Sequence, residues 1–508
     1  MAAMSAVTFA SGKRARGRYA ALMHEPRDTR AIIIGAGMSG LLAAIRLKRH
    51  GVDGFVILEK SAGIGGTWRD NAYPGCACDV PSHLYSYSIA PNPRWSRMFA
   101  GQPEILAYFE RQADARGLDA HLRLDTEVVR ADFDEADNCW TVTAVDGRTW
   151  RAPVLIVATG QLNRINIPDI PGRDTFAGAQ FHTARWGVSV DLAGKRVGVI
   201  GTGASAIQVV PGIVDRVGHL TVFQRSPPWI VPREDRAFAP RTRVLFAWLP
   251  LLRRAFRWLI WRKLEATWPA IGAPGSSKAH EMEALARDHL KAQVPDPALR
   301  AKLEPDFPIG CKRTLLSDDY YPALTRRRTD LETRAIAAIE PDGARLTDGE
   351  LIPLDVLIWA TGFASHGFVA PIEITGPHGS LARAWGRGAV AYRGTTVAGF
   401  PNLFLLYGPN TNLGHNSIIF MVEQQMRYAL PAILKLARGE AARIEVTREA
   451  QETYNRALQQ RLLTTAWAGG CDSWYKTGGG IMPNNWGSDT RAFARMMRRF
   501  DADAYEIA

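Results

Sequence analysis

The stretch RAIIIGAGMSGLLAAIRLKRHG, residues 30–51, decides the fold. An apolar run at 31–34 predicts a buried strand, and apolar residues recur at helical spacing after the turn that follows. In that turn Gly35, Gly37 and Gly40 form the pattern G-x-G-x-x-G. The first glycine permits a tight turn, the second lets a pyrophosphate approach the backbone, and the third lets the helix pack closely on the strand. The stretch therefore predicts a dinucleotide-binding unit with phosphates at a helix N-terminus.

An acidic residue ends the next predicted strand, GFVILEK (54–60). Glu59 lies 24 positions after Gly35, where a carboxylate accepts hydrogen bonds from a ribose diol and repels a 2′-phosphate. This first unit therefore favours FAD or NAD over NADP. A second glycine-rich element follows, GIGGTWRDNAYPGCACD (63–79), and the pair resembles the opening of two-dinucleotide-binding flavoproteins, which favours FAD. The other expected FAD contacts are Gly66, Thr67, Trp68 and Tyr85.

The same design repeats in GKRVGVIGTGASAIQVVPGI, residues 194–213. An apolar strand leads into a turn whose expected phosphate-binding residues are Gly201, Thr202, Gly203, Ala204, Ser205 and Ala206. Arg225 lies 24 positions after Gly201, so an arginine stands where the first unit has Glu59. Its guanidinium can pair with a 2′-phosphate, and the Ser226 hydroxyl can add a donor. The second unit therefore favours NADPH over NADH.

Two dinucleotide sites of opposite preference on one chain predict an enzyme in which NADPH reduces a bound flavin. The reduced flavin has three fates: it reduces a disulfide, it passes electrons to a partner or to O2, or it oxygenates a substrate after O2 adds to it. A disulfide reductase needs a redox-active cysteine pair with wider spacing than Cys76-Ala77-Cys78. The first fate is therefore excluded, and residue chemistry leaves the other two open.

The segment between the two units, DTFAGAQFHTARWG (174–187), narrows this choice. Its pattern Phe176-x-Gly178-x-x-x-His182-x-x-x-Trp186 resembles the fingerprint of type I Baeyer–Villiger monooxygenases, a family related to flavin-containing monooxygenases. The family continues with Pro or Asp, and this chain departs from it at Gly187. The resemblance covers residues 29–487 and includes three further segments: GGTWRDNAYPGCACD (65–79), LIWATGF (357–363) and PNLFLLYGPNTNLGHNS (401–417).

The resemblance implies both a reaction and a set of site residues. The reaction would insert one oxygen of O2 next to a ketone carbonyl, through a C4a-peroxyflavin, to give an ester or a lactone. In FPIGCKRTLLSDDYY (307–321) the resemblance makes Arg313 the active-site arginine, Asp79 its orienting carboxylate, and Lys312 a second contact to the 2′-phosphate. A permanent cation suits this chemistry because anionic oxygens develop in it. His182 and Trp186 complete the catalytic set, either in the chemistry or as a link between the two cofactor sites.

Two alternatives remain beside the Baeyer–Villiger reaction. One is N- or S-oxygenation by the same flavin chemistry, although related flavin-containing monooxygenases usually carry Tyr or Phe where this chain has Trp186. The other is a non-oxygenating NADPH-dependent flavoprotein reductase or oxidase. The identity of the ketone and the oligomeric state stay open at this point.

The predicted fold class is α/β, with two Rossmann-like dinucleotide-binding domains, for FAD and NADPH, and a helical insertion. The expected parts are a disordered basic tail at 1–28, an FAD-binding domain at 29–170 and 390–508, an NADPH-binding domain at 171–235 and 308–389, and the insertion at 236–307. Within the insertion, residues 242–268 mix tryptophans with arginines. They can shape substrate access or lie against a membrane surface.

Composition sets the remaining limits. Of the 508 residues, 46% are hydrophobic and 22% charged, as in globular proteins. The net charge of +12 is spread along the chain, which argues against a nucleic-acid partner. The partners that the family resemblance implies are a small-molecule ketone and O2. The N-terminal segment lacks the apolar core of a secretory signal. Five cysteines show no disulfide framework and no zinc pattern, so we expect no metal and a reducing, cytoplasmic setting.

Overall fold

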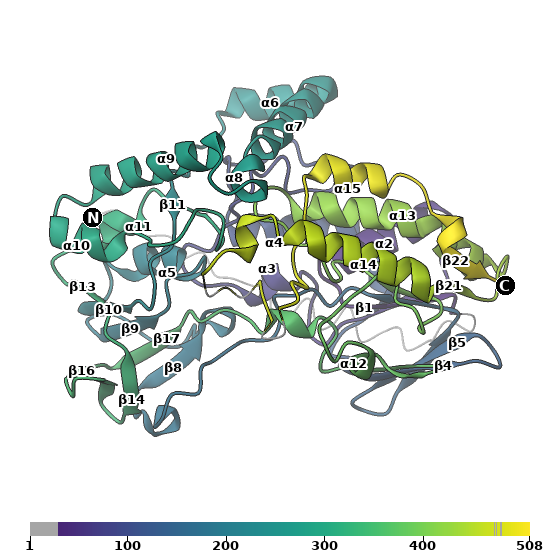
Figure 1. The fold of residues 1–508 in the computed structure, drawn as a ribbon, viewed down its shortest axis with the longest axis horizontal. Coiled ribbons are helices and arrows are strands. Elements are labelled where there is room, and N and C mark those ends of the chain that lie inside the picture. The colour runs from purple at the N-terminus through teal and green to yellow at the C-terminus, as the bar shows by residue number, and fades with distance from the viewer. Residues whose placement is uncertain (1–28, 472, 474, 478–479) are drawn as a thin grey trace, which may run out of the picture.

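The computed structural model describes residues 29–471, 473, 475–477 and 480–508, so the predicted tail at 1–28 lies outside the described residues. Two five-stranded parallel sheets form the frame (Figure 1). The first sheet runs in the order β20 (Leu403–Leu405), β7 (Val154–Val157), β1 (Ala31–Ile34), β2 (Phe55–Leu58), β3 (Leu122–Arg123). The second runs in the order β13 (Thr329–Glu332), β10 (His219–Phe223), β9 (Arg196–Ile200), β17 (Val356–Trp359), β8 (Ala179–His182). In both sheets the strand that leads into the glycine turn, β1 or β9, lies in the middle. Strands β2 and β3, or β10 and β13, lie on one side of it, and β7 or β17 lies next to it on the other. This shared arrangement confirms the predicted α/β class with two Rossmann-like units.

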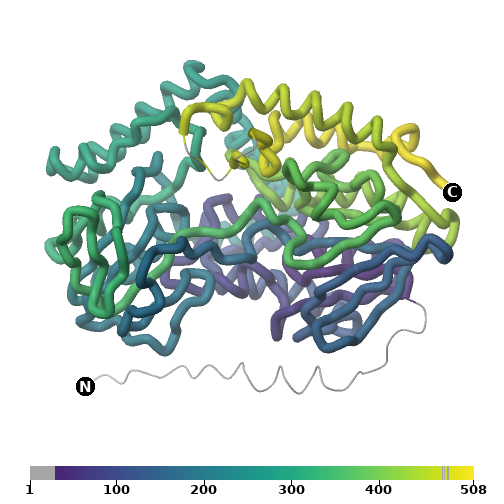
Figure 2. The backbone as a smooth tube through the Cα atoms, turned by 60° about the horizontal axis from the view of Figure 1, so that its bottom comes forward, coloured from purple at the N-terminus to yellow at the C-terminus, as the bar shows by residue number. Residues whose placement is uncertain are grey.

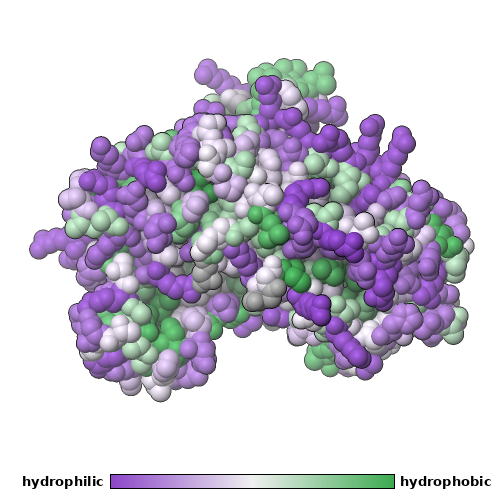
Figure 3. Space-filling model, viewed as in Figure 1, coloured by the Kyte–Doolittle hydropathy of each residue, from purple (hydrophilic) through white to green (hydrophobic). Residues whose placement is uncertain are grey.

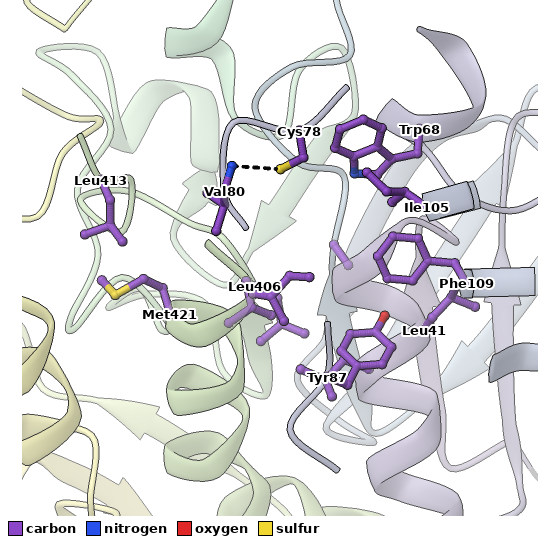
Figure 4. Close-up of a cluster of buried hydrophobic side chains, with 14 of the residues drawn as sticks. Leu41, Trp68, Cys78, Val80, Tyr87, Ile105, Phe109, Leu406, Leu413 and Met421 are labelled. Carbon is purple, nitrogen blue, oxygen red and sulfur yellow. Dashed lines mark hydrogen bonds between the residues drawn. The ribbon is translucent and has the colours of Figure 1, made fainter. Parts of the chain in front are cut away.

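The strands of the first sheet are buried on both faces. Strands β1, β2 and β7 read AIII, FVIL and VLIV, and all twelve side chains are buried. Such continuous apolar runs are typical of a parallel sheet that is covered on both sides. On one side lie the helices α2 (Met38–Arg49), α4 (Gln102–Asp114) and α13 (Ile418–Arg438). Figure 4 shows the resulting core, in which Leu41 and Phe109 lie close to Tyr87, and Met421 lies beside Leu406 and Leu413.

A third sheet covers the other side of the first. Its order is β19 (Gly379–Ser380), β18 (Glu373–Gly376), β4 (Val128–Asp134), β5 (Cys139–Ala144), β6 (Thr149–Ala152). Strand β18 pairs with β4, and the buried Ile374 packs in the same cluster as Trp140 and Leu155. The segment from β18 onward therefore joins the lobe of the first sheet. Strand β18 lies inside the expected NADPH-domain segment 308–389 but pairs with β4, 243 positions earlier in the sequence, and such a pairing leaves no local pattern.

The chain passes from the first lobe to the second and back again (Figure 2). The segments of the second sheet, teal and green, lie on the left of that view, and the purple start of the first sheet lies on the right. The two connections run side by side, with Ile165 and Phe363 paired antiparallel. The N–H of Asn166 donates to Gly362 O at 2.9 Å, and the N–H of Ala364 donates to Arg164 O at 2.9 Å. We call these paired segments, 164–166 and 362–364, the crossing ribbon.

The predicted insertion is helical, as expected for 236–307. Its helices are α6 (Pro240–Trp248), α7 (Pro250–Glu265), α8 (Pro269–Gly272), α9 (Ser277–Gln293) and α10 (Pro297–Leu303). Glu265, at the end of α7, fastens the insertion to the first lobe. Its carboxylate accepts hydrogen bonds from Asn416 Nδ2 at 2.8 Å and from the N–H and hydroxyl of Thr490 at 2.7 and 2.6 Å. His415 Nε2 lies 3.5 Å from the same carboxylate.

One pair of cysteines is bridged, which corrects the expectation drawn from their spacing. A disulfide joins Cys311 to Cys471 across 160 positions of the sequence. Such a pairing has no local signature, because the two residues meet only after the C-terminal segment has returned to the insertion. The bridge lies two residues before Arg313 and four residues before Tyr475. It therefore ties two segments that both reach the candidate active site.

Shorter elements complete the two lobes. The remaining helices are α3 (Thr67–Asp70), α5 (Ala206–Ile213), α11 (Tyr320–Leu324), α12 (Leu381–Ala384), α14 (Arg448–Leu462) and α15 (Thr490–Met496). The remaining strands are β11 (Ile230–Val231), β12 (Leu315–Leu316), β14 (Ile336–Glu340), β15 (Gly343–Leu346), β16 (Leu351–Pro353), β21 (Ile444–Val446) and β22 (Tyr505–Ile507). Within the described ranges, every helix is too short or too polar to cross a lipid bilayer.

Candidate active site

The first glycine turn is shaped by close backbone contacts. Gly35 has φ +102°, and a Cβ there would lie 2.7 Å from Ala158 O, so no other residue fits. Gly37 faces Gly66, whose Cβ would lie only 3.1 Å from the Cα of Gly37. The two predicted glycine elements thus meet and leave bare backbone at the N-terminus of α2. This arrangement fits a pyrophosphate, which needs close approach to backbone N–H groups.

The other residues predicted to contact FAD gather around the same helix end. Glu59 is buried, and its carboxylate accepts hydrogen bonds from the N–H groups of Ala36 at 2.7 Å and Ser61 at 2.9 Å. The indole of Trp68, beside Thr67 at the start of α3, donates to the hydroxyl of Tyr85 at 2.9 Å. The two hydrogen bonds to backbone N–H groups therefore hold the Glu59 carboxylate at the end of β2, and its remaining lone pairs can accept from a ribose.

The second glycine turn has open space at Gly203 and two cationic side chains in its unit, Arg225 and Lys312. Gly201 has φ +110° and packs against Ala360 O, while a Cβ at Gly203 would meet nothing within 4 Å, so ligand space lies there. The loop 204–205 leads directly into α5 at Ala206. Arg225 follows β10 at the surface, and the ammonium group of Lys312 donates to the Ser226 hydroxyl at 2.8 Å. The structure thus brings together Ser226 and Lys312, which the sequence separates by 86 positions.

Asp79 and Arg313 form an ion pair, with Nη2 and Nε of Arg313 at 2.6 and 3.1 Å from Asp79 Oδ2. Burial alone would raise the pKa of Asp79, but the charge and hydrogen bonds of Arg313 outweigh burial and hold that pKa below its ordinary value. Asp79 in turn raises the pKa of Arg313. Both groups are therefore charged at neutral pH, and the arginine keeps its Nη1 side for another ligand.

Helix α5 packs closely on the segment that precedes Asp79, and this contact places the ion pair between the segments of the two glycine turns. Gln208 of α5 donates to Ala77 O at 3.0 Å and accepts from the hydroxyl of Tyr73 at 3.1 Å. A Cβ at Gly75 would lie 2.5 Å from Gln208 O, and one at Gly212 would lie 2.8 Å from Pro74 O. The helix that follows the second turn thus packs directly on the segment that carries Asp79.

The fingerprint segment is structural in most of its residues. It supplies the edge strand β8, which pairs with β17. His182 is buried, its Nδ1 accepts from the N–H of Ala184 at 3.1 Å, and its Nε2 donates to Gly362 O at 3.0 Å. Burial lowers the pKa of His182, so the ring is neutral. Because both nitrogens have backbone partners, the structure favours the linking role over the direct chemical role for His182.

Trp186 packs edge-to-face on Phe181, with ring centroids 5.0 Å apart. This contact explains the departure from the family pattern at Gly187. A Cβ at Gly187 would lie 2.8 Å from the ring of Phe181 and 3.1 Å from Val190. A proline or aspartate at that position would therefore push the aromatic pair apart. The structure brings neither Trp186 nor His182 into contact with the Asp79–Arg313 pair.

The cysteines near the first turn are unsuited to redox exchange. Cys76 and Cys78 are both buried and unbridged. Burial raises the pKa of the Cys76 thiol to about 12 and also raises that of Cys78. Neither forms the thiolate that disulfide exchange requires.

Comparison with known proteins places this architecture. Residues 32–246 match a family model described as pyridine nucleotide-disulphide oxidoreductase. A Baeyer–Villiger monooxygenase of Streptomyces coelicolor is 44% identical over 488 residues, which cover 96% of this chain and 93% of the relative. The chain belongs to the Baeyer–Villiger monooxygenase family.

Solved structures agree with this assignment. The structure of OTEMO in complex with FAD and NADP has a TM-score of 0.85 to this monooxygenase, with 27% identity over 96% of this chain and all of the other. The ε-caprolactone-bound cyclohexanone monooxygenase has a TM-score of 0.84, with 29% identity over 95% and 100% of the two chains. The predicted family and its two-unit fold are therefore confirmed.

Several residues of the monooxygenase site lack a signal in the sequence. Arg233 donates to Cys78 O at 2.9 Å and helps to lower the pKa of Asp79. Burial raises the pKa of Tyr407 and raises that of Tyr475 to about 12, while the charge of Arg313 acts to lower both. Gln208 lies within the second glycine unit and Tyr407 within the segment 401–417, but nothing in either pattern indicates a contact with the Asp79–Arg313 pair or its segment. Only the aromatic, glycine-rich tail around Tyr475 stands out in composition.

Proposed function

We propose that this chain is an FAD- and NADPH-dependent monooxygenase that converts a small ketone to an ester or lactone with O2. The observation that carries the proposal is the Asp79–Arg313 ion pair, set where the segment of the first glycine turn meets α5 of the second. Oxygen insertion needs a charged guanidinium between the two dinucleotide sites, because negative charge develops on oxygen during the reaction. Simple electron transfer has no such requirement. The relatives named Baeyer–Villiger monooxygenase support the same reaction.

FAD is assigned to the first glycine turn and NADPH to the second. Gly37 and Gly66 would admit the pyrophosphate of FAD, Glu59 would bind its ribose, and Trp68 would help to place the rest. In the second unit Arg225, Ser226 and Lys312 would hold the 2′-phosphate. When bound, the flavin accepts a hydride and activates O2.

Arg313 performs the electrostatic part of the reaction in this proposal. Its guanidinium stays protonated at working pH, so it can stabilise negative charge on oxygen next to the ketone carbon without changing its own state. Asp79 holds two of its nitrogens and so orients the remaining donors. His182 acts at a distance, by fixing strand β8 to the crossing ribbon, and Trp186 packs on Phe181 of the same strand.

Labelled oxygen tests the reaction. The purified yellow protein is given NADPH and a panel of ketones under 18O2, and products are analysed by mass spectrometry. The proposal expects ester or lactone that carries one labelled oxygen. Labelled N-oxide or sulfoxide with suitable amines and sulfides, and no ester, would favour heteroatom oxygenation. NADPH oxidation that yields only peroxide with every substrate would identify the chain as an oxidase.

Arg225→Ala should raise KM for NADPH about tenfold and leave KM for NADH unchanged. The reason is the loss of a charge-assisted contact to the 2′-phosphate, worth ~1.5 kcal/mol at an exposed site. Steady-state kinetics with both nucleotides measure the ratio. Arg327→Ala is the matched control, because Arg327 is also exposed in the second lobe. An unchanged preference for NADPH would refute the assignment of the second unit.

A further inference from the structure

Helices α6 and α7 form a hairpin that projects from the body of the molecule (Figure 1). Of the fourteen large exposed hydrophobic side chains in the described part of the chain, eight lie in this hairpin. They are Val244, Leu245, Trp248, Leu249, Leu251, Leu252, Trp258 and Leu259. Trp248 and Leu251, on the two sides of the turn, are 79% and 75% exposed. Figure 3 shows the hydrophobic surface at the far end of the hairpin.

The inner face of the hairpin is firmly attached to the first lobe. The rings of Phe246 and Phe256 stack at 5.1 Å and both pack against His83. One nitrogen of Arg257 donates to three carbonyls, those of His83, Leu84 and Ser86, at 2.7 to 3.1 Å. Because the inner face is already packed and hydrogen-bonded to the first lobe, the exposed side chains on the outer face are not needed to complete the hydrophobic core. They form a rigid apolar surface of the folded protein.

The exposed charges of the hairpin are all positive, because Glu265, at the end of α7, is buried. Residues 240–264 contain seven arginines and lysines and no aspartate or glutamate. Arg241, Arg254, Arg262 and Lys263 are exposed, and Arg262 lies over the ring of Trp258 at 5.4 Å. A second copy of the chain would bring like charges together on such a surface. The complementary partner is an anionic surface that also accepts apolar side chains.

We propose that the α6–α7 turn docks this protein on anionic phospholipid bilayers. Trp248, Leu249, Leu251 and Leu252 enter the boundary between headgroups and acyl chains, and the flanking arginines bind lipid phosphates. Tryptophans at the interface and arginines at headgroup depth are typical of helices that lie on a membrane without crossing it. The proposal goes beyond the oxygenation chemistry and does not depend on it.

Co-sedimentation of the full chain with vesicles tests the proposal. One set contains phosphatidylcholine alone, and the other also contains phosphatidylglycerol. We expect binding to the anionic vesicles only, weakened at about 1 M salt because charge attraction is screened. The double variant Trp248→Ser/Leu251→Ser should lose at least about tenfold in vesicle affinity and keep the wild-type rate of NADPH oxidation. Leu463→Ser is the matched control, since Leu463 is 58% exposed on another helix end, and it should bind as the wild type does.

Three results would overturn the proposal. Wild-type protein that stays in solution with anionic vesicles would do so directly. Equal binding by the wild type and the double variant would place the membrane contact elsewhere, as on the basic N-terminal segment SGKRARGRYA (11–20). A wild-type dimer in size-exclusion chromatography that the double variant converts to a monomer would show that the turn serves self-association instead.

Discussion

Arg313→Ala should lower kcat for ester formation by about 100- to 1000-fold. A loss of this size is usual when one donor to a developing oxyanion is removed from a preorganised site. Here the substitution also leaves Asp79 partly buried beside an apolar side chain, so the carboxylate would gain a proton more readily. Product formation is measured by gas chromatography, and flavin content by the visible absorbance of the purified protein.

The adjacent Lys312→Ala is the control for this loss. Lys312 reaches Ser226 whereas Arg313 reaches Asp79, so neighbouring residues serve different groups. Lys312→Ala should therefore raise KM for NADPH and change kcat little. Arg313→Lys keeps the charge but loses the two-nitrogen contact, and it should restore part of kcat. If Arg313→Ala kept kcat within about threefold of the wild type, the proposed electrostatic role would be wrong.

Glu265→Ala should lower the free energy of unfolding by about 3–5 kcal/mol, the cost of breaking a buried charged network. The substitution removes the shared acceptor of Asn416 and Thr490 and the carboxylate beside His415, at the junction of α7, α13 and α15. Urea unfolding followed by circular dichroism measures the loss. Glu281→Ala is the control, because Glu281 pairs with Lys278 on an exposed face of α9 and should contribute less than about 1 kcal/mol. Equal unfolding midpoints for the two variants would contradict the prediction.

The same carboxylate predicts a pH dependence. Burial would raise the pKa of Glu265, but the nearby His415 and the hydrogen bonds from Thr490 outweigh it and lower the pKa from 4.5 to about 2. A carboxylate whose pKa is depressed on folding stabilises the protein above its unfolded pKa. The contribution of ~3 kcal/mol is therefore present at pH 5 and above and is lost as the pH falls toward 2. The unfolding free energy of Glu265→Gln should change less over that range.

The parts of the fold that could be predicted from sequence are those with a local physical cause. A strand, a glycine turn and a helix within some twenty residues define each dinucleotide-binding unit, and the end-of-strand residues Glu59 and Arg225 follow at a fixed offset. These patterns suffice because the turn requires glycine and the strand requires apolar residues.

What could not be predicted depends on contacts between distant segments. The pairing of β18 with β4 moves a strand between lobes, and the Cys311–Cys471 bridge spans 160 positions. Gln208 and Arg233 acquire their importance from carbonyls at positions 77 and 78, which no spacing reveals. The ion pair of Asp79 with Arg313 was expected from the family pattern alone, since a lone basic dipeptide is otherwise typical of a solvated surface.

The crossing ribbon has a consequence for how the two lobes move. Two covalent connections that are hydrogen-bonded to each other restrict twisting of one lobe against the other more than a single linker would. Gly362 O accepts from Asn166 within the ribbon and from His182 of the second sheet, so a single carbonyl joins the second sheet to the ribbon. If NADPH binds the second lobe as proposed, this carbonyl would help to fix the position of its nicotinamide relative to the flavin.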